Sequence, residues 1–488
     1  MSKFLVLTCI GLNLVNASAQ AEPLAQGFKP THMSVSASQE TWKLPAGERM
    51  GMSSVGLMQE VSTGLAAGLR AYTATGGQRG GFITLGGVMQ GRQPVGPGLN
   101  LEAEGFVGAG AGASGQALAG GGLMLRGALG VGVALPQGAR LSVGVSRVRF
   151  PSGTIASTQP YVGLSLPFGV QTRLDGAPVS HYTHQFLPTL KRLSVDAGTR
   201  TTAGAAQGDL GLVGVEWRTF LNTYSYVALE TQAAYSGASA GYMDIMAGGG
   251  LRLPLTQGVA LYTDAMVGGG GGGAVATDSG RLAQLRVGTQ LQLGRHWVLD
   301  ASAARLRATD GSFGGKALGL SLGYQFGSPL GQPGAGLQAH ALRLRLASQR
   351  YSGASADWRN NAEGAVGLVG AQLDYFVTPN WYLTGQGLAA ATGGAGAYMT
   401  GLMGAGAHTE LGSHWFAEAE AMLGAAGGGG LNTGSGALGQ VNMNLGYALT
   451  PRLELIASLG RAQSSGGAFK ANVVGVSLAY RMGVVGTR

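Results

Sequence analysis

The string Gly319-Leu-Ser321-Leu-Gly323 matches the G-x-S-x-G motif, in which a serine on a sharp strand-to-helix turn acts as a nucleophile. Here the serine lies in the middle of an alternating segment, where no such turn is expected. The related segments Gly163-Leu-Ser-Leu-Pro and Gly475-Val-Ser-Leu-Ala lack the final glycine. We interpret the match as chance.

Two other features could bind ligands. His181 and His184 have a spacing that could chelate a metal, but they lie in an expected connection, with no nearby Asp or Glu. The glycine runs 268–273 and 427–430 could cradle a phosphate, but no Lys-Ser/Thr follows either run. The sequence therefore predicts no metal, no cofactor, no nucleic-acid partner and no enzymatic activity.

The sequence is a triplication. Gly163-Leu-Ser-Leu recurs as Gly319-Leu-Ser-Leu and as Gly475-Val-Ser-Leu, each time 156 residues further on. Earlier in the repeat the first offset is 160, as from Glu104 to Asp264, so four residues drop out of the second copy. Solenoid repeats run about 20 to 50 residues, so a unit of this size predicts a block of several strands.

The elements within each repeat are predicted to be strands. The segment 440–445 places polar residues at even positions and apolar residues at odd ones, and the related segment 284–293 keeps this parity, which is typical of a strand with two different faces. In the third copy we expect eight strands, at about 337–351, 367–378, 381–393, 396–411, 415–429, 436–450, 453–464 and 469–482. Short and longer connections alternate between them.

Composition narrows the class further. The 488 residues include 90 glycines, with 45% apolar and 11% charged residues, and the net charge is +9. So much glycine disfavours long helices. An apolar stretch at 4–15 followed by Ala17-Ser-Ala19 predicts a signal peptide over residues 1–19, which would remove the only cysteine, Cys9. Disulfides and thiolate metal sites are then excluded.

Twenty-four strands with short turns on one side and longer loops on the other resemble the outer-membrane β-barrels of Gram-negative bacteria. The resemblance implies an all-β, transmembrane antiparallel β-barrel of about 24 strands, built from three tandem eight-strand repeats. We place the barrel at residues 20–488, with repeats at about 31–168, 180–326 and 336–482. It also implies location in the cell outer membrane and, as partners, membrane lipid including lipopolysaccharide and the barrel-assembly machinery.

Strand parity assigns polar side chains to two environments. Twelve residues are predicted to line the interior: Arg126, Gln284, Arg286, Gln290, Arg343, Arg345, Gln440, Asn442, Asn444, Glu104, Asp264 and Glu420. Basic and acidic members fall on different strands, so they could set a field across a pore or neutralise each other. Arg149, Arg305 and Arg461 share the lipid-facing parity near a membrane interface, where they could contact lipopolysaccharide phosphates or turn inward to an acidic neighbour.

One wide barrel or three narrow ones could be built from these strands. Small inward residues such as Ala128, Gly130, Gly132 and Gly288 would fill narrow barrels poorly, which favours one wide barrel. The function expected first is therefore a channel or translocation pore for solutes or polymers. The alternatives are a structural sleeve or assembly component with a protein guest in its lumen, and, third, an adhesin or enzyme acting through loops.

Overall fold

The structure is a computed structural model that describes residues 33–112, 118–168, 183–327, 337–353, 358–359 and 364–487. These residues form 24 strands arranged as three separately closed barrels of eight strands each. The predicted all-β architecture of three eight-strand units is thus confirmed. The prediction of one wide barrel is wrong.

Each repeat supplies one barrel. Barrel 1 consists of β1 (Met33–Lys43), β2 (Arg49–Ser62), β3 (Leu65–Gly76), β4 (Ile83–Gly96), β5 (Leu99–Ala111), β6 (Leu123–Ala134), β7 (Arg140–Arg149) and β8 (Ala156–Phe168). Short 3-10 turns η1 (Pro45–Gly47) and η2 (Pro136–Gly138) follow β1 and β6.

Barrel 2 consists of β9 (Thr183–Val195), β10 (Leu210–Phe220), β11 (Ser225–Ser236), β12 (Met243–Pro254), β13 (Val259–Gly271), β14 (Arg281–Leu293), β15 (Trp297–Ala308) and β16 (Gly314–Gly327). Barrel 3 consists of β17 (Leu337–Gly353), β18 (Ala365–Thr378), β19 (Trp381–Thr392), β20 (Met399–Glu410), β21 (Trp415–Gly427), β22 (Ala437–Ala448), β23 (Leu453–Ser464) and β24 (Lys470–Thr487). The strands predicted for the third copy match these to within about five residues.

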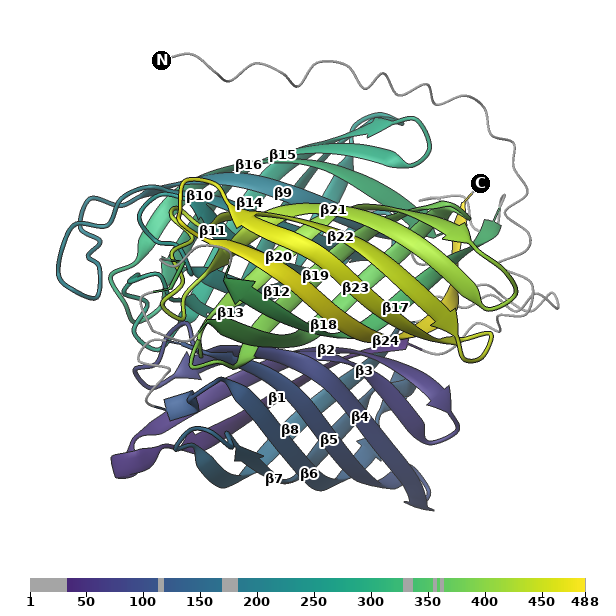
Figure 1. Cartoon of the computed structure of the whole chain (residues 1–488), viewed down its shortest axis with the longest axis horizontal. Coiled ribbons are helices and arrows are strands. Elements are labelled where there is room, and N and C mark those ends of the chain that lie inside the picture. The colour runs from purple at the N-terminus through teal and green to yellow at the C-terminus, as the bar shows by residue number, and fades with distance from the viewer. Residues whose placement is uncertain are drawn as a thin grey trace.

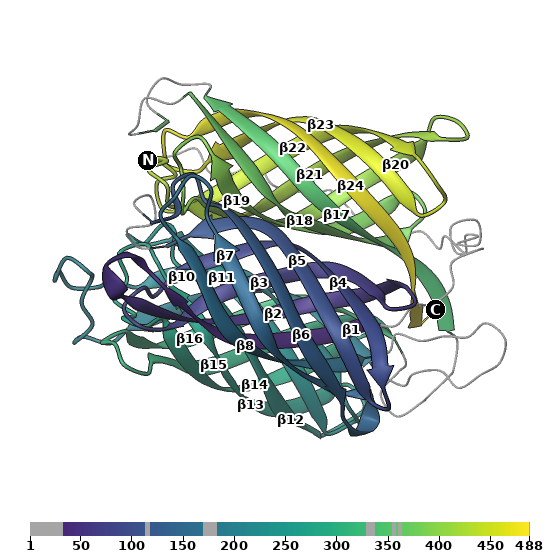
Figure 2. The same cartoon turned by 90° about the horizontal axis from the view of Figure 1, so that it is seen from below.

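Closure comes from the last strand of each repeat returning to the first. β8 pairs antiparallel with β1, β16 with β9, and β24 with β17. Figure 1 and Figure 2 show the three barrels side by side, with their long axes running in similar directions. Short turns, such as the one between β2 and β3, lie at one end of the barrels, called here the short-turn end, and the longer loops lie at the other, the loop end.

The interiors of these narrow barrels are filled because glycines lie opposite large side chains. A Cβ added at Gly288 would overlap the ring of Tyr262, and one added at Gly406 would overlap the ring of Tyr382. An inward glycine on one strand therefore makes room for an aromatic side chain from the next. This pairing is why small inward residues do not require a wide lumen, which corrects the argument for one large barrel.

The outer surfaces are apolar and exposed. Leu129, Leu285 and Leu423 have 67%, 67% and 72% of their surface accessible, and they point away from the barrel interiors. Tryptophans begin strands at the short-turn end: Trp297, Trp381 and Trp415. An apolar belt with aromatic residues at its edge is the surface that outer-membrane barrels present to lipid. In the described ranges, no helix has the length and apolar character needed to cross a bilayer.

Barrels 1 and 2 meet through their loops. The amide of Gly80 donates to the carbonyl of Asp278 at 2.7 Å, and the Arg281 guanidinium donates to the carbonyl of Thr75 at 2.9 Å. Beside this contact, hydrogen bonds from Arg79 hold the pKa of the Glu48 carboxyl below its usual value. The loop between β3 and β4 is thereby fixed against the loop between β13 and β14.

The contacts between neighbouring barrels are called seams here. The two seams that involve barrel 3 use positions that correspond to those between barrels 1 and 2. In barrels 2 and 3, the Ser435 hydroxyl donates to the carbonyl of Tyr235 at 3.0 Å, and Tyr235 is the repeat counterpart of Thr75. Between barrels 3 and 1, Gly121 packs so closely on Ala391, the next counterpart, that it has no room for a side chain. At each seam, the loop region between the third and fourth strands of one barrel thus contacts the loop between the fifth and sixth strands of its neighbour. The three heterologous contacts close a ring.

Substitution of Gly427 tests this ring. A Cβ at Gly427 would overlap the backbone of Gly241 across the seam between barrels 2 and 3. We expect Gly427→Val to destabilise the protein by about 1–3 kcal/mol, because the seam cannot accept the added volume. Faster hydrogen exchange should appear in residues 237–242. Gly105→Val is the matched control, since a Cβ there meets nothing within 4 Å. Equal stability and exchange in the two variants would contradict the contact.

Candidate functional site

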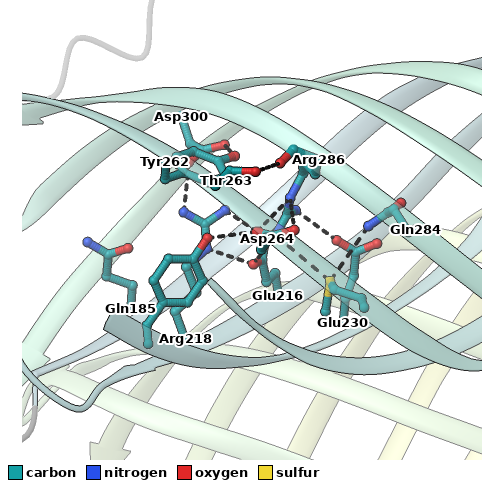
Figure 3. A network of polar contacts seen from close by, with 12 residues as sticks. Gln185, Glu216, Arg218, Glu230, Tyr262, Thr263, Asp264, Gln284, Arg286 and Asp300 are labelled. Carbon is teal, nitrogen blue, oxygen red and sulfur yellow. Dashed lines mark hydrogen bonds and ion pairs between the residues drawn. The ribbon is translucent and has the colours of Figure 1, made fainter. Parts of the chain in front are cut away.

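The interior of barrel 2 holds a network of buried charges, shown in Figure 3. Arg286 on β14 contacts Glu216 at 2.5 Å, Asp264 at 2.7 Å and Glu230 at 3.1 Å. Arg218 on β10 lies on the other side of Glu216, at 2.6 Å. All five side chains point inward because their strands alternate between lipid-facing and interior positions.

Aromatic and amide groups extend this network along the barrel axis. The Tyr262 hydroxyl donates to Asp300 at 2.8 Å, and the Arg218 guanidinium lies 4.3 Å from the centre of the Tyr262 ring. Gln290 donates to Gln185 at 2.9 Å and to Asp300 at 3.3 Å. The polar groups of Tyr262, Gln290 and Asp300 therefore bind one another rather than a solute.

Barrel 1 has a simpler version of the same arrangement. Arg126 on β6 contacts Glu40 at 2.9 Å and Glu104 at 2.7 Å, and Arg70 on β3 approaches Glu104 from the other side at 2.5 Å. The Ser146 hydroxyl also donates to Glu40, at 2.6 Å. These contacts cross the barrel from one wall to the other.

In barrel 3 both central cations come from β17. Arg343 contacts Asp374 and Glu418, each at 2.8 Å, and Arg345 contacts Asp374 at 2.5 Å and Glu420 at 2.7 Å. One feature of the networks is shared by all three repeats. The acids at corresponding positions are Glu104, Asp264 and Glu420. Arg126 and Arg286 on the next strand contact the first two, whereas Asn442 faces the third. In the third repeat, where Asn442 replaces the arginine, Arg345 forms the ion pair with Glu420 instead.

The structure places all the residues predicted for the interior inside barrels, in mostly buried positions: Arg126, Gln284, Arg286, Gln290, Arg343, Arg345, Gln440, Asn442, Asn444, Glu104, Asp264 and Glu420. They do not share one lumen, because each belongs to its own barrel. Basic and acidic members within a barrel pair directly, so the interior is neutralised rather than divided into two charged walls.

Several members of the networks were not among the predicted site residues. Glu216 and Arg218 are separated by one residue in an otherwise mainly apolar strand, and Glu40 and Asp374 also occupy inward positions. Two opposite charges at positions i and i+2 share a strand face, so the sequence carried a usable signal. The partners of each charge across the barrel carried no such signal, because they depend on which strands close together.

The arginines predicted to contact lipid headgroups are exposed on the barrel exteriors, near the loop end. Arg305 is paired with Asp196 in the adjoining loop, at 2.5 Å, and this pair holds the pKa of Asp196 below its usual value. Within the described part of the chain, Arg149 and Arg461 have no ion-pair partner. Contact with lipopolysaccharide remains a prediction for these two, while the third has an acidic neighbour on the outer surface.

The two sequence motifs with possible chemistry are structural. His184 lies on β9, not in a connection, and it is buried with its Nδ1 3.0 Å from the Thr219 hydroxyl and its ring stacked on Phe326. His181 lies outside the described residues. Ser321 is in the middle of β16, so it has no strand-to-helix turn. No group of three or more His, Cys, Asp or Glu side chains in the described ranges is placed to hold a metal.

A large space lies between the barrels. A cavity of about 1250 Å³ is lined mainly by the second, third and fourth strands of each barrel, together with the loops that follow β3 and β13. Its walls are mainly aliphatic or aromatic, with Leu57 from barrel 1, Trp217 from barrel 2 and Leu373 from barrel 3 at corresponding positions. This cavity is the candidate functional site.

The cavity differs at its two ends. The interlocked loops that contain Gly81, Gly272 and Gly428 lie at the loop end, and all three glycines line the cavity there. Toward the short-turn end the lining includes Leu166 and Leu221, which remain 48% and 52% exposed. Among the described residues, the exposed lining at the loop end therefore includes the polar Gln78, Thr202 and Asp278, whereas at the short-turn end it includes leucines.

Comparisons with known proteins find similar structures but no relatives by sequence. No protein-family model matches the chain, and no match is found among curated proteins. Its structure is similar to a ferric enterobactin receptor mutant from Pseudomonas aeruginosa, with 11% identity, a TM-score of 0.30 and coverage of 93% of this chain and 82% of that one.

Two further solved structures are similar at the same level. For the siderophore receptor PirA from Acinetobacter baumannii, the identity is 9% and the TM-score 0.28, with 93% of this chain and 81% of that one covered. For OpdQ from Pseudomonas aeruginosa, the identity is 8% and the TM-score 0.22, with 93% and 98% covered. TM-scores this low do not establish a shared arrangement of barrels or a shared activity.

The geometry itself defines the class. Closed antiparallel barrels with exposed apolar exteriors, aromatic residues at one edge and polar interiors characterise a transmembrane β-barrel protein of the outer-membrane type. Within that class, the chain is a single polypeptide that joins three eight-stranded barrels around a common apolar cavity.

Replacement of Arg286 tests the interior networks. Arg286→Asn copies the residue that barrel 3 has at this position, but barrel 2 has no second cation in contact with Asp264 in the described residues. We expect a loss of about 3–5 kcal/mol, because breaking a buried ion pair leaves uncompensated charge. The free energy of unfolding in urea would measure it. Asn442→Ala is the control and should cost only about 1 kcal/mol. Equal losses would show that Arg286 does not hold the network.

The lipid contact is tested by the double variant Arg149→Ala/Arg461→Ala. We expect it to lose part of the extra stability that lipopolysaccharide confers, about 1 kcal/mol for each charge near the anionic surface. Arg305→Ala should lose less, because Asp196 already neutralises that arginine. Unfolding free energies in bilayers with and without lipopolysaccharide measure the difference. Full lipopolysaccharide-dependent stability in the double variant would contradict the contact.

Proposed function

We propose that this chain is an outer-membrane transport protein that holds an apolar guest between its three barrels, and that it is not a water-filled pore. The guest occupies the shared cavity, while the barrels form its walls. Residues 1–19 direct export as a signal peptide, and the barrel-assembly machinery inserts the chain into the outer membrane. The role is not enzymatic.

The observation that carries this proposal is the location of the free space. Each barrel interior is crossed by direct ion pairs, namely Arg126–Glu40, Arg286–Glu216 and Arg343–Glu418, and eight-stranded barrels have interiors only wide enough for side chains. The cavity of about 1250 Å³ instead lies outside the barrels and has apolar walls. Mainly apolar walls suit an apolar ligand better than a polar solute.

The two functions that the sequence predicted from a wide lumen, a pore and a sleeve for a partner protein, must be revised. A passive pore for solutes or polymers required a single large barrel, and the closure of three separate barrels removes that lumen. The alternative of a sleeve for a partner protein is retained in altered form, because the cavity could seat an apolar polypeptide segment between the barrels. The lining and its position within the lipid-facing region favour an apolar occupant of either kind.

Planar-bilayer conductance distinguishes the two classes. We expect the purified, inserted protein to show no stable open-channel steps, because the barrel interiors are filled and the central cavity is apolar. Insertion would be verified in the same sample by the resistance of the strands to protease. An apolar fluorescent probe should bind the protein and gain intensity. Large steps that shrink when neutral polymers are added would overturn the proposal in favour of an aqueous pore.

A further inference from the structure

The three repeats do not contribute equally to the wall of the central cavity. At one set of corresponding positions, barrels 1 and 2 carry Leu69 and Leu229, whereas barrel 3 carries Gly385. All three residues line the cavity. A Cβ placed on Gly385 would meet nothing within 4 Å, so this glycine is not required by close packing.

A second set of positions shows the same asymmetry. Leu85 of barrel 1 and Ile245 of barrel 2 correspond to Gly401 of barrel 3, and all three line the cavity. A Cβ on Gly401 also meets open space. Gly weakens a strand and here relieves no clash, and its presence at both positions enlarges the cavity on the side of barrel 3.

The size and continuity of the cavity indicate what it could hold. Water occupies about 30 Å³ per molecule in the liquid, and a methylene group is of similar size, so the space corresponds to roughly 40 methylene groups. That is enough for the two acyl chains of one lipid. The walls belong to the same outward strand faces that form the exposed apolar belt, so lipid chains already surround the protein at this depth.

The chemistry of the exposed lining at each end indicates the source of the lipid. Exposed lining residues at the loop end include the polar Gln78, Thr202 and Asp278, whereas those toward the short-turn end include Leu166 and Leu221, over which acyl chains enter at lower cost. In outer-membrane barrels the short turns face the periplasm, so the nearer leaflet is the inner one. We propose that the cavity is a lipid-binding site that holds the acyl chains of a glycerophospholipid from the inner leaflet, admitted at the short-turn end. This inference rests on the proposed function.

Filling the wall of barrel 3 tests the inference. The double variant Gly385→Leu/Gly401→Ile installs the residues that barrel 2 carries at these positions. Gly127→Val is the matched control, because Gly127 faces outward on barrel 1 with open space around it and corresponds to Val287 of barrel 2. Each protein would be extracted from outer membranes in mild detergent, washed free of loose lipid, and its retained lipid identified and counted by native mass spectrometry.

We expect the wild type and Gly127→Val to retain a bound glycerophospholipid, and the filled variant to lose it. Equal retention by the filled and control variants would overturn the inference, as would retention of lipid A, which would come from the opposite leaflet. A polypeptide in the cavity would overturn the lipid assignment but leave the proposed function intact. A wild-type protein that retains no guest and conducts ions would overturn both.

A second measurement uses the wild type alone, in case the filled variant does not fold. A phospholipid with a photoreactive acyl chain is supplied in the membrane, and the washed protein is then irradiated. Cross-links should fall on residues 399–403 of β20, where Met399 and Met403 line the cavity. Cross-links confined to the outer belt around Leu129 or Leu423 would contradict the inference.

Discussion

The width of an eight-stranded barrel is the constraint on which this structure depends. Once β8 pairs with β1, and the corresponding strands close the other two repeats, each interior has room for side chains and little else. Inward charges must then find partners across the barrel, because a buried unpaired charge is costly. Glu104, Asp264 and Glu420 are met by arginines in all three repeats, although in the third the arginine comes from a different strand.

Because the three barrels are narrow and filled, the space that could hold a ligand lies between them rather than inside them. In a bilayer there is little hydrophobic driving force between apolar surfaces, so association relies on close packing and hydrogen bonds, as it does between membrane helices. The seams follow this rule, with glycine and alanine backbones in contact at Gly427 and Ala391 and direct hydrogen bonds between loops. Three walls enclose the cavity, joined at their seams and by strand contacts such as that between the Tyr375 and Phe326 rings, and Gly385 and Gly401 widen it on one side.

Much of the fold could be predicted from the sequence. The alternation over 440–445 and 284–293 gave the strands and their inward faces, because side-chain direction in a strand depends only on local parity. Closure could not be predicted, because a strand at the end of a repeat can pair either with the next repeat or with the start of its own. The inward glycines were misleading for the same reason. Gly288 implies an empty wall until the neighbouring strand is known to supply Tyr262.

The candidate site could be predicted even less than the fold, because it exists only once the strands have closed into three barrels. The cavity walls come from outward residues that sequence parity assigns simply to lipid, and nothing local distinguishes Leu229 from the exposed Leu285. Only the ring of seams, formed between residues about 200 positions apart such as Tyr235 and Ser435, turns those strand faces toward one another. Function would therefore be sought inside the barrels if sequence alone were considered.

The most direct test of separate closure is a disulfide across the strand pair that closes barrel 1. Val35 on β1 and Leu166 on β8 are register partners, and directly opposed Cβ atoms in antiparallel strands lie about 4.5–5.5 Å apart, near the spacing that disulfides need. Cys9 falls within the predicted signal peptide, so the mature protein provides a cysteine-free background. Separate closure predicts that Val35→Cys/Leu166→Cys oxidises readily within one chain, with a shift in gel mobility reversed by reduction. Failure of this pair to cross-link in correctly inserted protein would contradict the closure of barrel 1 and return the strands to a wider barrel.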